Sequence, residues 1–266
     1  KGQYTKGDPR FKWVTEDGEP LLGSSFAGFV IPAFGLDHVR TEQFAVSAAF
    51  KADFFRAARA LQGTLQNIDR AFAYESHLYP LETVNGLAFD LGVSPGGLGS
   101  GIVAVDIETH GMNNEVIERV SFSDGMYTAS VNWDSAASSF MNALFSRTDC
   151  IFAVHNSAFD LPRLMANGVH ISQHCLDHQI YDTMWGGVVL QPDLHKSLCR
   201  MSTIYLDLEP WKGQRGSMWY ELGQFDPVFY SAKDAYVTAH LAMKLIPITK
   251  GLGMWRLIMG GGKDAG

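Results

Sequence analysis

The segment Ile102-Val-Ala-Val-Asp-Ile-Glu-Thr109 decides the fold of this chain. It is a nearly continuous apolar run, which is typical of a strand covered on both faces. The run is interrupted at Asp106 and Glu108. Because successive side chains of a strand alternate between faces, these two carboxylates project from the same face. The segment therefore predicts a buried strand that ends in a pair of acidic side chains.

Two carboxylates this close repel each other unless a cation lies between them. Hard oxygen ligands suit Mg²⁺ or Mn²⁺ better than zinc. The alternative is a solvated strand end, since about one Asp-x-Glu is expected by chance in a chain of this length. The pair indicates a metal site only together with other motifs.

The segments that follow indicate an α/β domain. Residues 116–124 and 126–133 alternate like strands and meet at Asp124-Gly125, a strong hairpin signal. Cys150-Ile-Phe-Ala-Val154 is a second buried strand. Helical patterns cover residues 135–145, 157–167, 183–190, 193–204 and 226–246. Strands followed by helices predict a mixed sheet with helices packed on it.

Two further motifs carry chemistry. Asn156-Ser-Ala-Phe-Asp160 follows the second strand directly, where a helix begins. A capping Asn is the alternative interpretation of that segment. Tyr230 and Asp234 are four residues apart in an expected helix and share one of its faces, although an ordinary amphipathic helix gives the same pattern.

Composition narrows the class of protein. Hydrophobic residues make up 46% of the 266 and charged residues 18%, which predicts a sizeable core and excludes intrinsic disorder. The longest apolar run, residues 26–36, is shorter than the roughly 20 residues of a membrane span. The net charge of -7 argues against a basic surface that holds nucleic acid. Three widely spaced cysteines fit a reducing compartment.

In this order, the three motifs resemble the DEDD superfamily of 3′-5′ exonucleases. The resemblance extends from Ile102 to about Leu245 and implies a ribonuclease H-like mixed sheet flanked by helices. Tyr230 places the chain in the tyrosine branch, because Phe229 stands where the sister branch has its His.

Other segments resemble the proofreading domains of family A DNA polymerases, particularly phage-type ones; they lie at residues 181–184, 190–194, 197–198, 202–205 and 209–212. The resemblance implies a single-stranded DNA 3′ end as substrate, a polymerase domain or replisome component as partner, and the cytoplasm of a bacterial cell, with the gene carried by the cell or by a phage. A ribonuclease D-like RNA exonuclease and a non-catalytic module that holds 3′ ends are the alternatives.

The resemblance also implies two-metal hydrolysis that releases 5′-mononucleotides, with two Mg²⁺ or Mn²⁺ ions. Asp106 is expected to bridge both ions, and Glu108 and Asp234 to complete one site. Asp160 is expected to hold the other ion, partly through water, and Tyr230 to position the attacking water.

Substrate contacts are expected from five residues. Thr109 follows Glu108 and is expected to touch the terminal sugar, and Asn156 the nucleotide or its phosphate. Phe159 is expected to pack beneath the site or to stack on a base. Trp211 and Lys212 are expected to reach the single strand, with a structural role as the alternative.

A cluster of possible zinc ligands lies outside these motifs. It consists of His170, His174, Cys175, Asp177 and His178. On a helix, residues 170, 174 and 178 would share one face, which would suit Zn²⁺. Polar surface with scattered histidines is the alternative.

The glycine-rich segment 92–101 predicts a linker. It would separate an N-terminal α/β appendage, residues 1–91, from the exonuclease domain at 102–258 and a flexible tail at 259–266. The appendage is expected to hold a strand at 28–33 and a helix at 45–65. Residues 28–60 faintly resemble the C-terminal end of uracil-DNA glycosylase-like domains, but Gly35 and Leu36 replace the family's His and Pro, so no glycosylase activity is expected. An unrelated α/β appendage is the alternative.

Overall fold

The computed structural model describes residues 54, 55, 58, 62, 78–80, 101–110, 115–125, 128–192, 194–206, 208 and 227–259. The chain divides into two compact units, residues 1–66 with 209–225 and residues 67–208 with 226–266. Within the first unit, Phe54, Phe55 and Ala58 are helical. The expected strand at 28–33 and the glycosylase-like motifs at 28–40 lie outside the described residues, as does most of the expected helix at 45–65.

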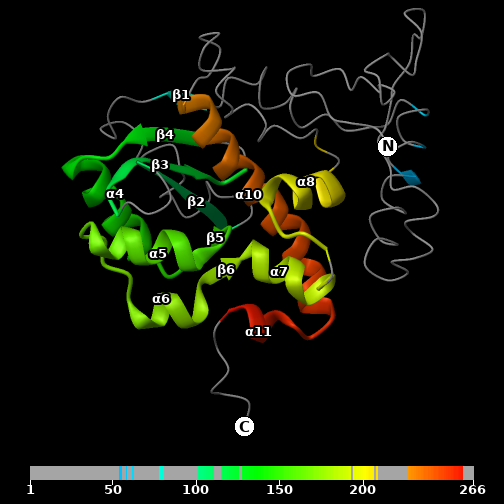
Figure 1. The fold of residues 1–266 in the computed structure, drawn as a ribbon. Helices are drawn as coiled ribbons and strands as arrows, with labels where there is room; N and C mark the ends of the chain where they lie inside the picture. The colour runs from blue at the N-terminus through cyan, green and yellow to red at the C-terminus, as the bar shows by residue number, and fades with distance from the viewer. Residues whose placement is uncertain are drawn as a thin grey trace, which may run out of the picture. The chain divides into compact units, whose positions relative to one another are not determined.

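A six-stranded mixed sheet forms the second unit, in the order β1-β4-β3-β2-β5-β6 (Figure 1). Strand β3 runs antiparallel to β2 and β4, whereas the pairs β1–β4, β2–β5 and β5–β6 are parallel. The sheet confirms the ribonuclease H-like fold that the sequence predicts. Its strands are β1 (Leu78–Pro80), β2 (Ile102–Thr109), β3 (Ile117–Ser123), β4 (Thr128–Asn132), β5 (Ile151–Val154) and β6 (Ile180–Asp182).

Helices cover both faces of the sheet (Figure 1). The odd-numbered residues of β2, such as Val103 and Val105, pack into one core with α4 (Ser135–Phe145) and α5 (Ser157–Ala166). The even-numbered residues face α10 (Pro227–Gly251), which packs along β2, β3 and β4. The alternation within β2 therefore directs apolar side chains toward one layer and the acidic pair toward the other.

Several predicted elements are confirmed. The helix α4 has the predicted bounds and begins at Asp134, whose side chain accepts a hydrogen bond from the Ala137 N–H at 2.7 Å. The helix α7 (Thr183–Leu190) also has the predicted bounds. The β3–β4 hairpin turns at Gly125, which has a φ of +88°, and Nε2 of His240 on α10 lies 3.0 Å from the Gly125 carbonyl oxygen.

Two helices differ from the prediction. The helix α8 (Leu198–Leu206) begins later than residue 193, because the Lys196 ammonium binds the carbonyl oxygens of residues 191, 192 and 194 in the segment before it. The helix α10 continues through Pro247 to Gly251, although proline predicts a helix end. Two residues after the proline, the Thr249 hydroxyl donates to the Leu245 carbonyl oxygen, 3.0 Å away, within the same helix.

The sequence patterns do not predict four short elements: β1, β6, α6 (Gln173–His178) and α11 (Trp255–Ile258). The strand β1 comes from the segment that we assigned to the appendage, and it pairs with β4. Residues 92–100 lie outside the described residues, and the division into appendage, linker, catalytic domain and tail stays a prediction. None of the described helices combines the length and hydropathy that a membrane span requires.

Candidate metal and active site

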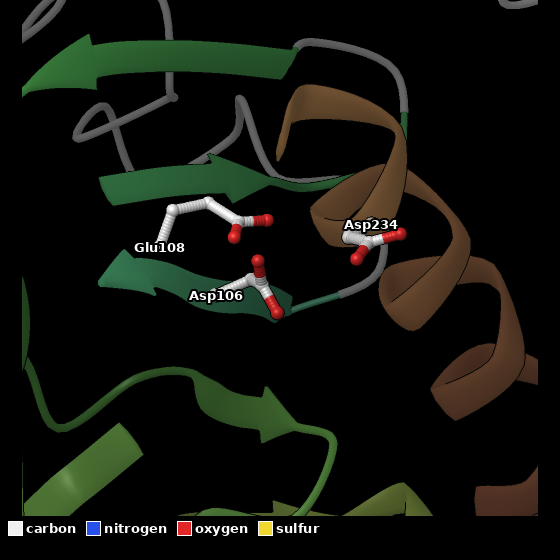
Figure 2. A group of neighbouring side chains, drawn as sticks. All are labelled: Asp106, Glu108 and Asp234. Carbon is white, nitrogen blue, oxygen red and sulfur yellow. The ribbon is translucent and has the colours of Figure 1, made fainter. Parts of the chain in front are cut away.

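Three carboxylates converge where β2 meets α10. Each of Asp106, Glu108 and Asp234 contributes an oxygen atom, and these atoms lie within 4.8 Å of one another. Figure 2 shows the side chains from the strand and from the helix pointing toward one another. The two motifs, more than 120 positions apart in the sequence, therefore form one cluster.

The sheet register explains why the strand and the helix meet at this point. Asp106 lies opposite Ser121 in the antiparallel β2–β3 pair, so both side chains occupy the same sheet face. The Ser121 hydroxyl donates a hydrogen bond of 2.8 Å to the carbonyl oxygen of Ser231 on α10. This contact fixes α10 against the sheet one turn before Asp234.

The donor set of this cluster fits a hard divalent cation. All three groups are carboxylates, and a cation among them would remove their mutual repulsion. Carboxylate oxygens are typical ligands of Mg²⁺, Mn²⁺ and Ca²⁺, whereas structural zinc sites usually include Cys or His. Among the described residues, no other group of three or more His, Cys, Asp or Glu side chains is close enough to share one ion.

The fourth predicted carboxylate, Asp160, lies in the first turn of α5 and is 3% exposed. Burial raises its pKa well above 3.8, and the negative charges of Asp182 and Glu108 add to that shift. A hydrogen bond with the backbone of Ile107 on β2 acts in the opposite direction. Asp160 therefore borders the cluster from the β5 side without belonging to the three-carboxylate group.

Tyr230 lies one turn before Asp234 on α10, as predicted, and is 6% exposed. Residues four apart occupy the same helix face, so the phenol and the carboxylate share the side that faces the sheet. Phe229, the position of the histidine in the sister branch, is partly buried in the same turn.

Asn156 precedes α5 with a left-handed backbone, φ 72°, and its side chain makes no capping hydrogen bond. The alternative interpretation of this residue as a side-chain cap is therefore wrong. Thr109 lies next to a register shift at the end of β2 and is 7% exposed.

Phe159 is partly buried and packs against the hydrophobic core. The Arg163 guanidinium lies 3.6 Å from the centroid of its ring. The ring therefore packs on the core, and its expected place beneath the site stays a prediction. Trp211 and Lys212 lie outside the described residues, and their proposed contacts stay predictions.

The structure does not bring three of the possible zinc ligands together, although the ring centroids of His174 and His178 lie 4.9 Å apart. His170 precedes α6, which begins at Gln173, so the three histidines do not share one helix. The Cys175 side chain is fully buried in the core, where burial raises the pKa of its thiol to about 12. The zinc interpretation is therefore wrong, and the histidines that lie on the surface are polar surface groups.

Three residues at the end of β5 and the start of α7 were not among the predicted site residues, although the resemblance implies a helix start at Asp182. Asp182 ends β6 and is 2% exposed. Nδ1 of His155, at the end of β5, lies 2.8 Å from the Thr183 hydroxyl oxygen. Trp185, in the first turn of α7, is 52% exposed. Polar residues directly follow both β5 and β6, and this pattern could have indicated the region. It is visible in the sequence only if the three residues of β6 are recognised as a strand.

The chain matches one protein family and has a fold similar to that of several solved structures. A 3′-5′ exonuclease family, DNA_pol_A_exo1, matches residues 96–250. No curated protein matches the sequence. Solved structures with a similar fold include the catalytic core of RRP6 from Trypanosoma brucei, at TM-score 0.52 and 16% identity, covering 68% of this chain and 49% of that one. Escherichia coli RNase D, an exoribonuclease involved in structured RNA processing, is similar at TM-score 0.53 and 16% identity, covering 68% of this chain and 48% of that one. The chain spans about half the length of these two structures.

Proposed function

Because the chain belongs to the 3′-5′ exonuclease family DNA_pol_A_exo1, we propose that it removes nucleotides from single-stranded DNA 3′ ends as 5′-monophosphates and proofreads for a DNA polymerase. It is a 3′-5′ exonuclease of the DEDD type. The observation that carries the chemistry is the convergence of three carboxylates from β2 and α10 within 4.8 Å.

The placement of the residues supports the following roles. Asp106, Glu108 and Asp234, whose oxygens lie within 4.8 Å of one another, would hold Mg²⁺ or Mn²⁺ ions. When bound, such ions neutralise phosphate charge and lower the pKa of a coordinated water. Asp160, in the first turn of α5, would be the fourth carboxylate to help hold the ions. Tyr230 would orient the attacking water through its hydroxyl group, because a phenol is a poor base at neutral pH.

The choice of DNA rests on two observations. The matching family is named for the exonuclease of DNA polymerase A, and the segments around residues 181–212 resemble phage-type proofreading domains. An exoribonuclease is the second candidate, since RNase D and RRP6 share the fold. A non-catalytic module is disfavoured, because holding a 3′ end does not require three facing carboxylates.

The function is tested with 3′-labelled single strands of DNA and RNA of the same sequence, digested in Mg²⁺. The wild type is compared with Asp106→Ala and with Asp149→Ala, which removes an exposed carboxylate that pairs with Arg147. We expect DNA to be degraded faster than RNA, by the wild type and Asp149→Ala alike, and no degradation by Asp106→Ala. Faster degradation of RNA would establish the second candidate. A wild type inactive on both strands, or an active Asp106→Ala variant, would overturn the enzymatic function.

A further inference from the structure

Asp182 ends β6 and begins α7. Its Oδ1 atom accepts hydrogen bonds from the backbone N–H groups of Met184 at 2.8 Å and Trp185 at 3.4 Å. These are the contacts of an ordinary N-cap, which satisfies donors left free in the first turn of a helix. They account for only part of what this carboxylate binds.

The same carboxylate also binds the start of α5. Oδ1 accepts the Asn156 N–H at 3.1 Å, and Oδ2 accepts both the N–H and the hydroxyl of Ser157, each at 2.7 Å. The helix α5 therefore takes its cap from a side chain 25 positions later in the sequence. We call these five hydrogen bonds the Asp182 clamp.

The clamp is possible because β5 and β6 are parallel neighbours. Val154 lies beside Asp182 in their register, so the two strands end together and the two helices start side by side. Without the clamp, the Asn156 side chain would be the natural cap of α5. With it, the backbone of Asn156 stays left-handed, at a φ of 72°, and its amide is left out of capping.

The clamp fixes the part of α5 that borders the carboxylate cluster. Asp160 lies one turn after Ser157, and its contact with the backbone of Ile107 requires α5 to begin at this position. A shift of the helix start by one residue would rotate Asp160 by about 100° around the helix axis, away from β2.

We propose that Asp182 is a positioning residue of the exonuclease: it holds Asp160 and the Asn156 amide in place by capping α5 and α7 with one carboxylate. This role presupposes the function proposed above. Asp182 is not itself a metal ligand, because its two oxygens have about four acceptor positions and five protein donors already occupy them.

The test compares Asp182→Asn with Asp134→Asn. Asp134 is the matched control, since it caps α4 with the same kind of carboxylate contact and lies outside the site. An Asn at position 182 keeps the shape but turns an N–H₂ group toward backbone donors. Three quantities are measured on each protein: Mn²⁺ affinity by calorimetry, amide hydrogen exchange at residues 157–161, and kcat and KM on labelled DNA and RNA.

For Asp182→Asn we expect Mn²⁺ affinity and kcat to fall by about 10- to 100-fold, the range typical of residues that orient metal ligands, together with faster exchange at 157–161. Asp134→Asn should leave all three quantities within about twofold of wild type. A folded Asp182→Asn protein with wild-type Mn²⁺ affinity would overturn the positioning role, even if exchange at 157–161 rises.

Ser157→Ala keeps the test decisive if Asp182→Asn does not fold. It removes only the hydroxyl bond to Oδ2, and we expect a smaller loss of Mn²⁺ affinity, about threefold. An unchanged affinity in this variant would then overturn the role. A wild type that binds Mn²⁺ but degrades neither strand would overturn the exonuclease function alone, because Mn²⁺ affinity and exchange still decide the role of Asp182.

Discussion

Five acidic side chains lie in two neighbouring regions, and the regions differ in the chemical groups that surround each carboxylate. At the junction of β2 and α10, the oxygens of Asp106, Glu108 and Asp234 face one another. At the ends of β5 and β6, Asp182 faces five N–H and O–H donors, and Asp160 contacts the backbone of β2.

This difference in surroundings indicates two roles for a carboxylate: one is structural and the other is to bind a cation. A carboxylate surrounded by protein donors has its charge compensated within the fold. Carboxylates that face one another repel, and a divalent cation bound among them offsets that repulsion. We therefore propose that the β2–α10 region binds metal ions and that Asp182, in the β5–β6 region, holds the neighbouring helix α5 in position. Substitutions in the two regions should have different consequences.

The largest effect is expected from Asp234→Asn, which removes one charge from the facing group. We predict that exonuclease activity falls by at least about 10³-fold, which corresponds to about 4 kcal/mol of transition-state stabilisation. In EDTA, the free energy of unfolding should rise by about 1 kcal/mol, because a like-charge repulsion is relieved. Activity assays and urea denaturation measure the two changes. Asp149→Asn is the control, and a stability loss in EDTA for Asp234→Asn would contradict the repulsion.

The next-largest effect is expected on the KM for single-stranded substrate. Trp185 exposes an indole one turn after Asp182, on the helix that begins beside Asn156. We predict that Trp185→Ala raises KM for single strands about 5- to 100-fold with little change in kcat, since stacking on one base contributes about 1–3 kcal/mol. The control is Met165→Ala, an exposed apolar residue on α5. Equal KM values for Trp185→Ala and wild type would show that no base stacks there.

A smaller effect tests how closely α7 is packed. A Cβ at Gly186 would lie 2.6 Å from the Tyr181 hydroxyl oxygen, and that ring is stacked on Trp255. We predict that Gly186→Ala lowers the free energy of unfolding by about 1–3 kcal/mol. In Gly187→Ala, the new methyl group meets the flexible end of Met201, and the gain of about 1 kcal/mol in helix propensity offsets much of the cost. Urea denaturation of the two variants checks the contrast, and equal losses would contradict it.

The smallest effect is a pH dependence in the metal-free protein. Burial raises the folded-state pKa of Asp160 above 3.8, so its protonated form favours folding. The contribution to stability is complete below pH 3.8 and is lost as the pH rises through the raised pKa. Asp160→Asn, which does not titrate, should lack this loss. Urea denaturation in EDTA across pH 3–8 measures it, and parallel pH profiles for the two proteins would contradict the shift.

Long periodic elements could be predicted from the sequence because their pattern is local. The buried run of β2, the Asp124-Gly125 turn and the amphipathic stretch of α4 each carry their own signal. Short elements such as β6 could not be predicted, since three residues show no period and their strand conformation depends on pairing with β5. The predicted end of α10 at residue 246, directly before Pro247, is wrong, because the helix continues through the proline.

The distinction between local patterns and tertiary structure also explains which site residues could be predicted. The resemblance of three motifs to the DEDD superfamily implied Asp106, Glu108 and Asp234 as ligands, and the structure brings these three carboxylates together. The motifs did not predict that Asp160 is buried beside these three carboxylates and not among them, nor that Asp182 caps α5. Both facts follow from where β5 and β6 end, which is a tertiary property.

The most direct measurement is anomalous diffraction from crystals soaked in Mn²⁺. We predict a peak among the carboxylate oxygens of Asp106, Glu108 and Asp234, and none at the oxygens of Asp182. A Mn²⁺ ion bound to Asp182, or crystals with no peak at the β2–α10 junction, would contradict the division between a metal-binding and a positioning region.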